Sequence, residues 1–455
     1  MPGHHDTIAA LATPQGTSAI AVIRASGPDT RSIAEALGGG PPLPRTARRA
    51  DYRSRSGELI DTVIATWFAG PNSYTGEDTL EISCHGNPFI AHKILEDLLA
   101  RGCRSAEPGE FTQRAFLNGK LDLTQAEAVM DVIHASSDIA LASANAQLRG
   151  GLAKRIEALI GSLLDVLAHI EAYIDFPDED LPPTDRATAK SKIIDIIQNI
   201  NILRSSERYR SALRDGFKVV IAGPPNAGKS SLLNRLVGRD RALVSPEPGT
   251  TRDFIEERII IGGHLVRIFD TAGIRESASA LESLGIDKSL ELIKDADVVL
   301  MVFEASIGDS PTLPDALADK LKPNQVIVVL NKSDLPNCAA PTGPIPVPFS
   351  MATVRLSALY GHGVETLIST LSAKLNRPEF QASDGIAVNA RHAEALDSAA
   401  HALSSIPSRL GLDAQAIELV ASDIRAALAE LSKICGDVDN ERMLDRLFAA
   451  FCIGK

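Results

Sequence analysis

The segment Gly223-Pro-Pro-Asn-Ala-Gly-Lys-Ser230 constrains the fold of this chain more than any other. It follows the apolar run 219–222 and precedes Ser231-Leu-Leu-Asn-Arg-Leu236, a pattern that predicts a strand, a glycine-containing loop and a helix. In such a loop, backbone N–H groups turn inward around phosphate oxygens. Lys229 then offers a positive charge to the β- and γ-phosphates, and Ser230 a hydroxyl ligand for Mg²⁺. The segment therefore predicts an α/β domain that binds a nucleoside triphosphate.

Two motifs downstream fit the metal and γ-phosphate side of such a site. Asp270-Thr-Ala-Gly273 ends the apolar alternation 265–269, which places a carboxylate at a strand end where it can reach the Mg²⁺ shell through water. Gly273 is free to turn toward the γ-phosphate. Between the two motifs lies Gly249-Thr-Thr-Arg-Asp253, whose Thr251 we expect to complete the Mg²⁺ shell as a switch residue.

The base is indicated by Asn331-Lys-Ser-Asp334, which follows the apolar run 326–330. A carboxylate at Asp334 can accept from both N1–H and the exocyclic amine of guanine, two donors that adenine does not present together. Ser357-Ala358, after the strand-like run 353–356, is the usual last element of a guanine site. The sequence therefore predicts guanine rather than adenine as the base.

Length and composition set the wider bounds. The chain has 455 residues, 44% of them hydrophobic, and a net charge of −12, so we expect two to four globular domains. The acidic balance argues against a strong nonspecific grip on nucleic acid, although it leaves room for a local basic patch. Neither a signal peptide nor a run of about 18 apolar residues is present, so we expect a cytoplasmic protein without a membrane span. The cysteines are odd in number and scattered, which favours neither disulfides nor zinc: Cys84, Cys103, Cys338, Cys435 and Cys452.

The pattern along the chain predicts three domains. Residues 1–118 alternate strand-like runs with turns, with strands expected near 17–23, 59–68 and 78–83 and a helix near 89–99. Residues 119–215 and 379–455 carry apolar residues at helical spacing, and residues 216–378 form the nucleotide-binding domain. The simplest architecture joins the two helical stretches into one all-α bundle, with the α/β domain inserted into a loop of it. The alternative is two unrelated helical segments.

Several motifs together resemble one family: the phosphate loop, Gly249-Thr-Thr-Arg-Asp253, Pro108-Gly-Glu-Phe-Thr-Gln-Arg-Ala-Phe-Leu-Asn118, Asp175-Phe-Pro-Asp-Glu-Asp180 and the terminal Phe451-Cys-Ile-Gly-Lys455. Over essentially its whole length the chain is similar to the MnmE/TrmE tRNA-modification GTPases. The resemblance implies a homodimer that works with an FAD-dependent partner protein. It also implies a carboxymethylaminomethyl-type modification of the wobble uridine of certain tRNAs. Cys452 would be a participant, or alternatively a small buried hydrophobe beside Phe451.

The resemblance further implies that the N-terminal domain binds a tetrahydrofolate derivative, 5-formyl- or methylene-tetrahydrofolate, as one-carbon donor. The matching positions are Arg24, Glu81, Lys120 and the terminal Lys455. A pterin offers donor groups to a carboxylate, and a folate tail offers carboxylates to Arg and Lys, so the residue types suit the ligand.

Hydrolysis needs a separate explanation, because Ile274 stands where related enzymes carry a glutamine that orients water. The resemblance implies a K⁺ ion that supplies positive charge and brings two G domains together, with ligands from Asn226, Ser245, Glu247 and Thr250. Glu282 matches the acid that positions water, with a solvated loop carboxylate as the alternative. The expected catalytic residues are thus Lys229, Asp270 and Glu282. The expected GTP contacts are Asn226, Ala227, Gly228, Lys229, Ser230, Ser231, Ser245, Thr250, Thr251, Asp270, Thr271, Ala272, Gly273, Asn331, Lys332, Asp334, Ser357 and Ala358.

Two rival functions remain open. A ribosome-assembly GTPase of the Era type would need a basic RNA-binding C-terminus with a G-x-x-G loop. Residues 380–455 contain no such loop and hold seven Lys/Arg against eleven Asp/Glu. The second rival is a folate-dependent one-carbon transferase with a purely regulatory G domain. Sequence barely distinguishes it from a tRNA-modification GTPase.

Overall fold

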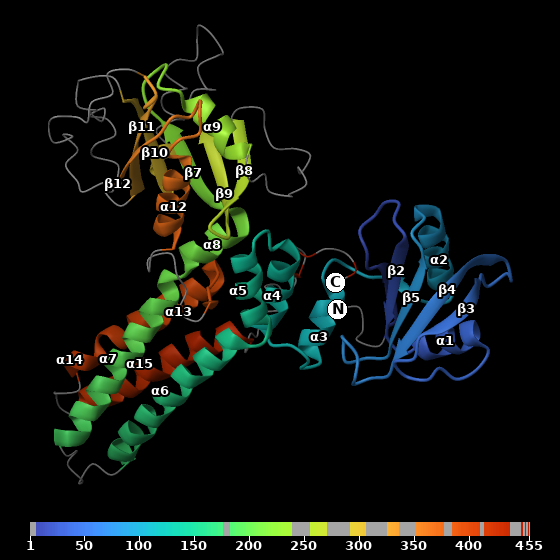
Figure 1. The fold of residues 1–455 in the computed structure, drawn as a ribbon. Helices are drawn as coiled ribbons and strands as arrows, with labels where there is room; N and C mark the ends of the chain where they lie inside the picture. The colour runs from blue at the N-terminus through green and yellow to red at the C-terminus, as the bar shows by residue number, and fades with distance from the viewer. Residues whose placement is uncertain are drawn as a thin grey trace, which may run out of the picture. The chain divides into compact units, whose positions relative to one another are not determined.

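The computed structural model describes residues 6–175, 183–238, 255–270, 292–305, 325–335, 352–376, 385–409, 414–436, 447–448, 451 and 454. The chain, whose helices and strands Figure 1 labels, divides into two compact units. The first comprises Met1–Met130, Leu148–Gly161 and Leu428–Lys455, and the second Asp131–Gln147 and Ser162–Ala427. The long helices α6 (Gly151–Asp175) and α15 (Ala414–Cys435) each contribute residues to both units. No helix of the described residues is both long and apolar enough to cross a membrane.

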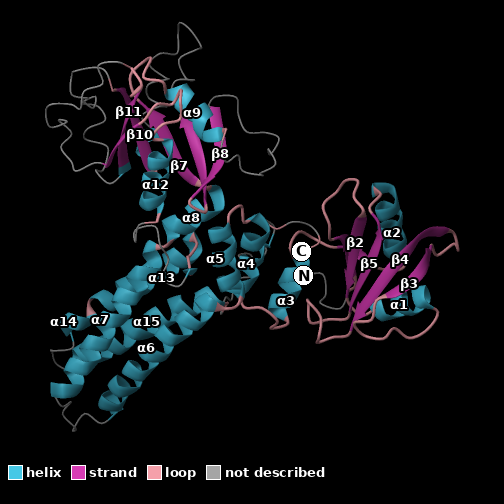
Figure 2. Cartoon of the chain, in the orientation of Figure 1, coloured by secondary structure: helices cyan, strands magenta, loops and turns pink. Residues whose placement is uncertain are grey.

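The first unit is built on a six-stranded sheet with the order β3-β4-β5-β2-β1-β6 (Figure 2). Its strands pair antiparallel except β1 with β6. The strands are β1 (Ile8–Leu11), β2 (Ile20–Ser26), β3 (Arg48–Arg53), β4 (Leu59–Phe68), β5 (Thr79–His85) and β6 (Arg104–Ser105).

One face of this sheet is covered by helices α1 (Thr30–Gly38) and α2 (Pro88–Ala100). Ile33 of α1 and Ile94 of α2 pack with Tyr52, Trp67 and other inward side chains of the strands. Because side chains alternate along a strand, the residues between these point to the opposite face. At the β1 end of that face, Phe111 and Tyr74 pack on Ile8 and Ala10.

The C-terminal segment packs beside the short helix α3 (Glu110–Leu117) and the start of α4 (Leu123–His134). Phe448 and Phe451 form an apolar cluster with Leu123 and Ala126. Gly109 approaches this cluster so closely, at φ 70°, that a Cβ there would lie 2.7 Å from the Phe448 carbonyl oxygen. The glycine of this Pro-Gly-Glu-Phe turn therefore leaves room for the Phe448 backbone.

In the second unit, a second sheet has the order β12-β11-β10-β7-β9-β8. All its pairs are parallel except β8 with β9. The strands are β7 (Phe217–Ala222), β8 (Ile255–Ile261), β9 (His264–Asp270), β10 (Val298–Glu304), β11 (Val326–Asn331) and β12 (Ala352–Arg355). Helices α9 (Lys229–Val237) and α12 (Val364–Leu375) pack in one core through residues such as Leu232 and Leu371. The parallel order brings the carboxyl ends of β7, β9 and β11 to one edge, where ligands bind in sheets of this kind.

Helices that precede this sheet in the sequence pack against helices that follow it. Helix α7 (Pro183–Ser205) lies against α13 (Ala390–Ser404) and α14 (Ile406–Arg409), and Arg204 of α7 pairs with Asp397 of α13. Arg425 of α15 pairs with Glu171 of α6 at 2.7 Å. The prediction that residues before and after the nucleotide-binding segment share one helical bundle is confirmed, as is the fold class. The domain limits at 118, 215 and 378 stay predictions.

The α/β segment enters and leaves beside the first residues of β9. At the entry, which follows helix α8 (Glu207–Asp215), Gly216 lies against the side chains of Leu265 and Arg267. At the exit, the Asn376 side-chain oxygen lies 3.0 Å from Nε2 of the buried His264. Beyond this exit, the chain contacts helix α5 (Asp138–Leu148) at Gly385, whose carbonyl oxygen accepts from the Ser143 hydroxyl at 2.6 Å.

Candidate functional site

The phosphate loop connects β7 to α9, as the sequence predicts. Two glycines in it are required by close approaches of neighbouring groups. A Cβ on Gly223 would lie 2.1 Å from the Val302 carbonyl oxygen, and one on Gly228 would lie 2.3 Å from Asn331 Nδ2. Asn226 has a positive φ of 63° and is exposed at the tip of the loop. The loop therefore packs onto β10 and β11 with its central residues directed to solvent.

Lys229 is the first residue of α9 and is almost fully buried. Its Nζ donates to the carbonyl oxygens of Gly223 at 3.0 Å and Pro224 at 2.9 Å. A lysine held over the mouth of the loop in this way has its charge where phosphate oxygens would replace the carbonyls as acceptors.

Ser230 and Asp270, predicted to lie near Mg²⁺, are brought together. The hydroxyl of Ser230 donates to Asp270 Oδ2 at 2.9 Å, and Asp270 is 2% exposed at the end of β9. A hydroxyl and a carboxylate oxygen at this distance form the kind of oxygen donor set that Mg²⁺ prefers. These residues therefore fit the predicted ion.

The predicted guanine end is tied to the phosphate loop by Asn331. Its Nδ2 donates to the Ala227 carbonyl oxygen at 2.8 Å, and its Oδ1 accepts from the Ala358 N–H at 2.9 Å. One buried side chain thus joins the loop that meets the phosphates to the loop Ser357-Ala358. Asp334 is exposed just beyond β11, where a base could reach its carboxylate.

Two further contacts at the guanine end are not apparent from the sequence. Arg235 of α9 donates through Nε to the Ala358 carbonyl oxygen at 2.9 Å and through Nη2 to that of Leu359. Lys332 has a positive φ of 60°, and its Nζ lies 2.6 Å from Glu304 Oε2 at the end of β10. No spacing rule connects these pairs, because they join residues far apart in the chain.

Ser231 is exposed at the start of α9, next to Ser230. The remaining nucleotide, K⁺ and catalytic predictions lie outside the described residues, and so do two in the terminal segment: Ser245, Glu247, Thr250, Thr251, Thr271, Ala272, Gly273, Glu282, Cys452 and Lys455.

The first unit brings together two of the predicted folate residues. Arg24 on β2 and Glu81 on β5 are register partners, and Arg24 Nη2 donates to Glu81 Oε1 at 2.8 Å. The guanidinium also lies 5.3 Å from the ring centroid of Tyr74 and 5.7 Å from that of Phe111. An aromatic contact of this kind restrains the charged group in one orientation.

The third residue, Lys120, is exposed, and its side chain passes within contact of Gly76, two residues beyond Tyr74. Gly454 lies against Leu11 and Ala12 at the end of β1, the strand that pairs with β2. Ala10, the residue before Leu11, is the register partner of Arg24. The residue next to Lys455 is thus placed beside the strand pair that carries Arg24.

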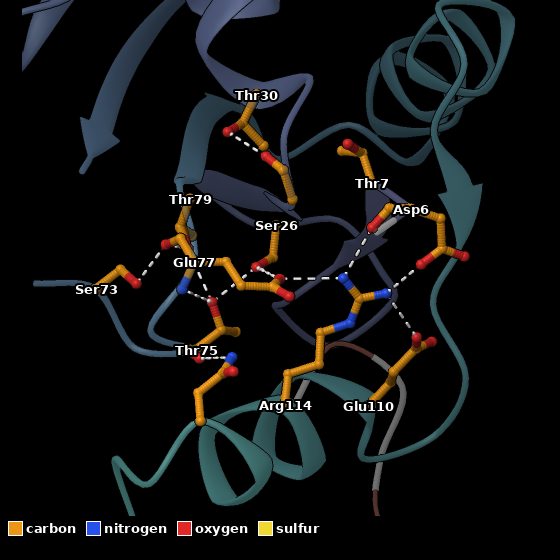
Figure 3. A network of polar contacts seen from close by, with 12 residues as sticks. Asp6, Thr7, Ser26, Thr30, Ser73, Thr75, Glu77, Thr79, Glu110 and Arg114 are labelled. Atoms are coloured by element: carbon orange, nitrogen blue, oxygen red, sulfur yellow. Dashed lines mark hydrogen bonds and ion pairs between the residues drawn. The ribbon is translucent and has the colours of Figure 1, made fainter. Parts of the chain in front are cut away.

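A buried polar network centred on Arg114 supports this site (Figure 3). The Arg114 side chain is 7% exposed and donates to Asp6 Oδ1 at 2.7 Å, Glu77 Oε2 at 3.0 Å and Glu110 Oε1 at 3.0 Å. Glu77 also accepts from Ser26 on β2 at 2.8 Å. The network therefore fixes α3 and the 73–79 turn against β2, two residues from Arg24.

The electrostatics of this network follow from its ion pairs. Burial by itself raises the pKa of Asp6 and Glu110, but hydrogen bonds from Arg104 and Arg114 outweigh it and lower the pKa of both carboxyls. Burial likewise raises the pKa of Tyr74, so its hydroxyl stays protonated near neutral pH. The lowered pKa values of Asp6 and Glu110 favour the charged form of both carboxyls beside the two arginines.

The parallel sheet, the phosphate loop and the guanine end together define a P-loop guanine-nucleotide-binding protein. Comparison with known families is more specific. A family model described as the MnmE helical domain matches residues 123–452, and one described as the GTP-binding protein TrmE N-terminus matches residues 7–120. The chain belongs to the MnmE family of tRNA modification GTPases.

Two curated relatives agree over full length. A tRNA modification GTPase MnmE from Opitutus terrae is 55% identical over 456 residues, with all of both chains covered. A tRNA modification GTPase MnmE from Akkermansia muciniphila is 42% identical over 471 residues, with 99% of each chain covered. The family predicted from the sequence motifs is confirmed.

Proposed function

We propose that this protein is the GTP-hydrolysing component of a complex that installs a carboxymethylaminomethyl-type group on the wobble uridine of tRNA. In this proposal it acts as a homodimer with an FAD-dependent partner protein, in the cytoplasm. The three domains are residues 1–118, which bind folate and dimerise, a helical domain of residues 119–215 and 379–455, and the G domain of residues 216–378. Family membership over the full chain favours this function over a ribosome-assembly factor.

The observation that carries the proposal is the joint presence of two sites in one chain. One is the phosphate loop with Ser230 and Asp270 at 2.9 Å, and the other is the Arg24–Glu81 pair at 2.8 Å. A GTPase whose sole activity is a nucleotide switch does not need a second site with paired opposite charges beside two aromatic rings. A chain that couples hydrolysis to one-carbon chemistry needs both.

At the nucleotide site, Lys229 is proposed to neutralise the β- and γ-phosphates, and Ser230 and Thr251 to ligate Mg²⁺, with Asp270 in its outer shell. The ion would stabilise the negative charge that develops between the phosphates. Glu282 is proposed to position the attacking water, in place of the glutamine that Ile274 replaces.

K⁺ is proposed to bind beside the same phosphates, through Asn226, Ser245, Glu247 and Thr250. The exposed position of Asn226 at φ 63° on the loop tip supports this assignment, because its amide oxygen is open to an ion and to a second G domain. Positive charge there would supply what an arginine from another protein supplies in related enzymes.

At the folate site, Glu81 is proposed to accept from the pterin ring of a 5-formyl- or methylene-tetrahydrofolate. Arg24, Lys120 and Lys455 would meet its carboxylates. The half-buried Tyr74, whose ring lies 5.3 Å from the Arg24 guanidinium, offers flat apolar surface for a ring system, and the buried Phe111 packs beside it. Cys452 is retained as a proposed participant in the chemistry.

The first test is GTP turnover by the purified protein in K⁺ and in Na⁺ at equal ionic strength. Matched ionic strength separates a specific ligand from general screening. Strong acceleration by K⁺ alone would support the proposed mechanism, and equal slow turnover in both salts would contradict it.

The second test separates coupled action from a folate-dependent transferase with a regulatory G domain. Asp270→Ala should abolish GTP turnover while leaving folate binding intact, because the two sites lie in different units. Loss of tRNA modification in this variant would favour coupled action. Retained modification would favour the transferase.

A further inference from the structure

Strand β3 and its flanking turns carry an unusual concentration of arginines for a chain with a net charge of −12. Five of them fall within eleven residues, and every one is exposed: Arg45, Arg48, Arg49, Arg53 and Arg55. Strand β3 lies at the end of the sheet order, so one of its edges has no neighbouring strand in that sheet (Figure 1). We call these five residues the β3 arginines.

The β3 arginines are weakly neutralised. Among the described residues, the one carboxylate that lies within 4.0 Å of any of them is Asp51, at 3.9 Å from Arg53 with both side chains more than half exposed. Arg45 and Arg55 instead donate to the backbone carbonyl oxygens of Asn72 and Ala100. By contrast, arginines elsewhere in the same unit, such as Arg24, Arg101, Arg104 and Arg114, have carboxylate partners at 3.0 Å or less.

The strand register places Arg49 on the sheet face that carries the proposed folate site, whereas Arg48 lies against Gly38 of α1 on the helix-covered face. Ala50 and Tyr52 of β3 point into the core with α1 and α2, so Arg49 points to the opposite face. Arg49 pairs with Ile64 of β4, which pairs with Ser83 of β5, and Ser83 pairs with Val22 of β2.

Arg24 and Glu81 occupy the next row on the same face, two residues along β2 and β5. Three strand spacings separate β3 from β2, which is roughly 14 Å. A polymer held at β3 can therefore present one of its units to the Arg24–Glu81 pair.

We propose that the β3 arginines bind the sugar-phosphate backbone of tRNA and so hold the nucleotide to be modified over the Arg24–Glu81 site. This inference rests on the proposed function in tRNA modification. Guanidinium groups pair with phosphates through two parallel hydrogen bonds, and exposed guanidinium groups with few carboxylate neighbours keep their charge available for such contacts. It also explains how a protein with an acidic surface overall meets a polyanion, because the attraction is confined to one strand edge.

Charged residues on an edge strand have a second, purely structural use, which is to prevent pairing with another chain. Positive or negative charges would serve that structural use equally well, and it predicts no effect of the arginines on how RNA affinity depends on salt. A salt titration therefore separates the two explanations.

The experiment measures tRNA binding to the full-length protein by fluorescence anisotropy over a series of salt concentrations. The test variant is Arg49→Gln/Arg53→Gln. Each phosphate contact contributes about 0.7–0.9 to the slope of log affinity against log salt, so the double variant should lose about 1.4–1.8 of that slope. Arg49→Lys/Arg53→Lys keeps the charges and should retain most of it.

The matched control is Arg31→Gln/Arg214→Gln, which makes the same change in net charge at side chains that are 60% and 65% exposed. It should keep the slope of the unmodified protein. Thermal unfolding checks that the variants fold, and the single Arg49→Gln variant, with an expected loss of about 0.7–0.9, serves if the double one does not.

An unchanged salt slope in the Arg→Gln variants of β3, or an equal loss of slope in the control variant, would overturn the β3 assignment. The proposed function would still stand. If the unmodified protein, alone and with its partner protein, bound no tRNA at any salt concentration, both the assignment and the proposed function would fall.

Discussion

Replacing Arg235 by alanine removes two hydrogen bonds that hold the loop at the guanine end in place. The guanidinium donates to the Ala358 carbonyl oxygen at 2.9 Å and to that of Leu359. Hydrogen bonds from a charged donor contribute about 1.5–3 kcal/mol when buried. Arg235 is half-buried and Leu359 is exposed, so we expect about 1–2 kcal/mol for the pair.

Losing these two hydrogen bonds should weaken nucleotide affinity. Without them the Ser357-Ala358 loop is less ordered in the free protein, and part of the binding free energy is then used to order it. A loss of 1–2 kcal/mol corresponds to a roughly 5- to 30-fold higher Kd. The effect should be equal for GTP and GDP, since Arg235 acts at the base end and not at the γ-phosphate. Turnover at saturating GTP should stay unchanged.

The assay is displacement of a fluorescent guanine nucleotide by GTP and by GDP. Arg235→Lys keeps one donor and should lose less affinity, and Lys294→Ala, an exposed change before β10, should lose none. Unchanged Kd values in Arg235→Ala would refute the reasoning. So would a loss confined to GTP, which would place the effect at the phosphates.

Three further predictions concern single residues. Asp334→Asn should weaken GTP binding by roughly 30- to 5,000-fold, because losing a charged hydrogen-bonding partner costs about 2–5 kcal/mol. It should also shift base preference toward xanthine, and unchanged guanine selectivity in a nucleotide competition assay would count against the base assignment. Asn226→Ala should abolish the stimulation of GTP turnover by K⁺ with GTP affinity nearly intact, and persistent K⁺ dependence would remove Asn226 from the ion site. Burial lowers the pKa of His264 below its ordinary 6.5, so below that pH the unfolded chain binds more protons than the folded one, and the free energy of unfolding should fall as pH drops from 7.5 to 5.5. Urea denaturation across this range should show that fall flattened in His264→Gln, and an identical pH dependence in both proteins would exclude His264 as its source.

The nucleotide site was predictable where its chemistry is local. Lys229 and Ser230 follow the glycines of one loop, and Asp270 ends an apolar strand, so spacing alone placed them. The Arg235 contact joins residues 123 positions apart, and no sequence period links a helix to a loop at that distance. Its geometry depends on the order in which β12, β11, β10 and β7 pair.

Strands were predictable in proportion to how clearly their burial alternates. Strand β4 was predicted at its observed limits, since Val63 and Trp67 stand on its buried face. Strand β2 begins at Ile20 and runs to Ser26, whereas the prediction was 17–23, because the polar Arg24 and Ser26 concealed its end. Strand β3 was not predicted at all, because its arginines left only two buried side chains to mark it.

The entry and exit of the α/β segment lie beside the same few residues of β9. Gly216 lies against Leu265 and Arg267, and Asn376 meets His264. A segment whose two ends are neighbours behaves as a cassette, since it can be gained or lost by one recombination event without opening the host fold. The helical bundle should accordingly close over a short artificial linker in place of residues 217–376, and the excised segment should remain a self-contained sheet. Excision of residues 217–376 would thus show whether the helical bundle folds without the nucleotide-binding segment.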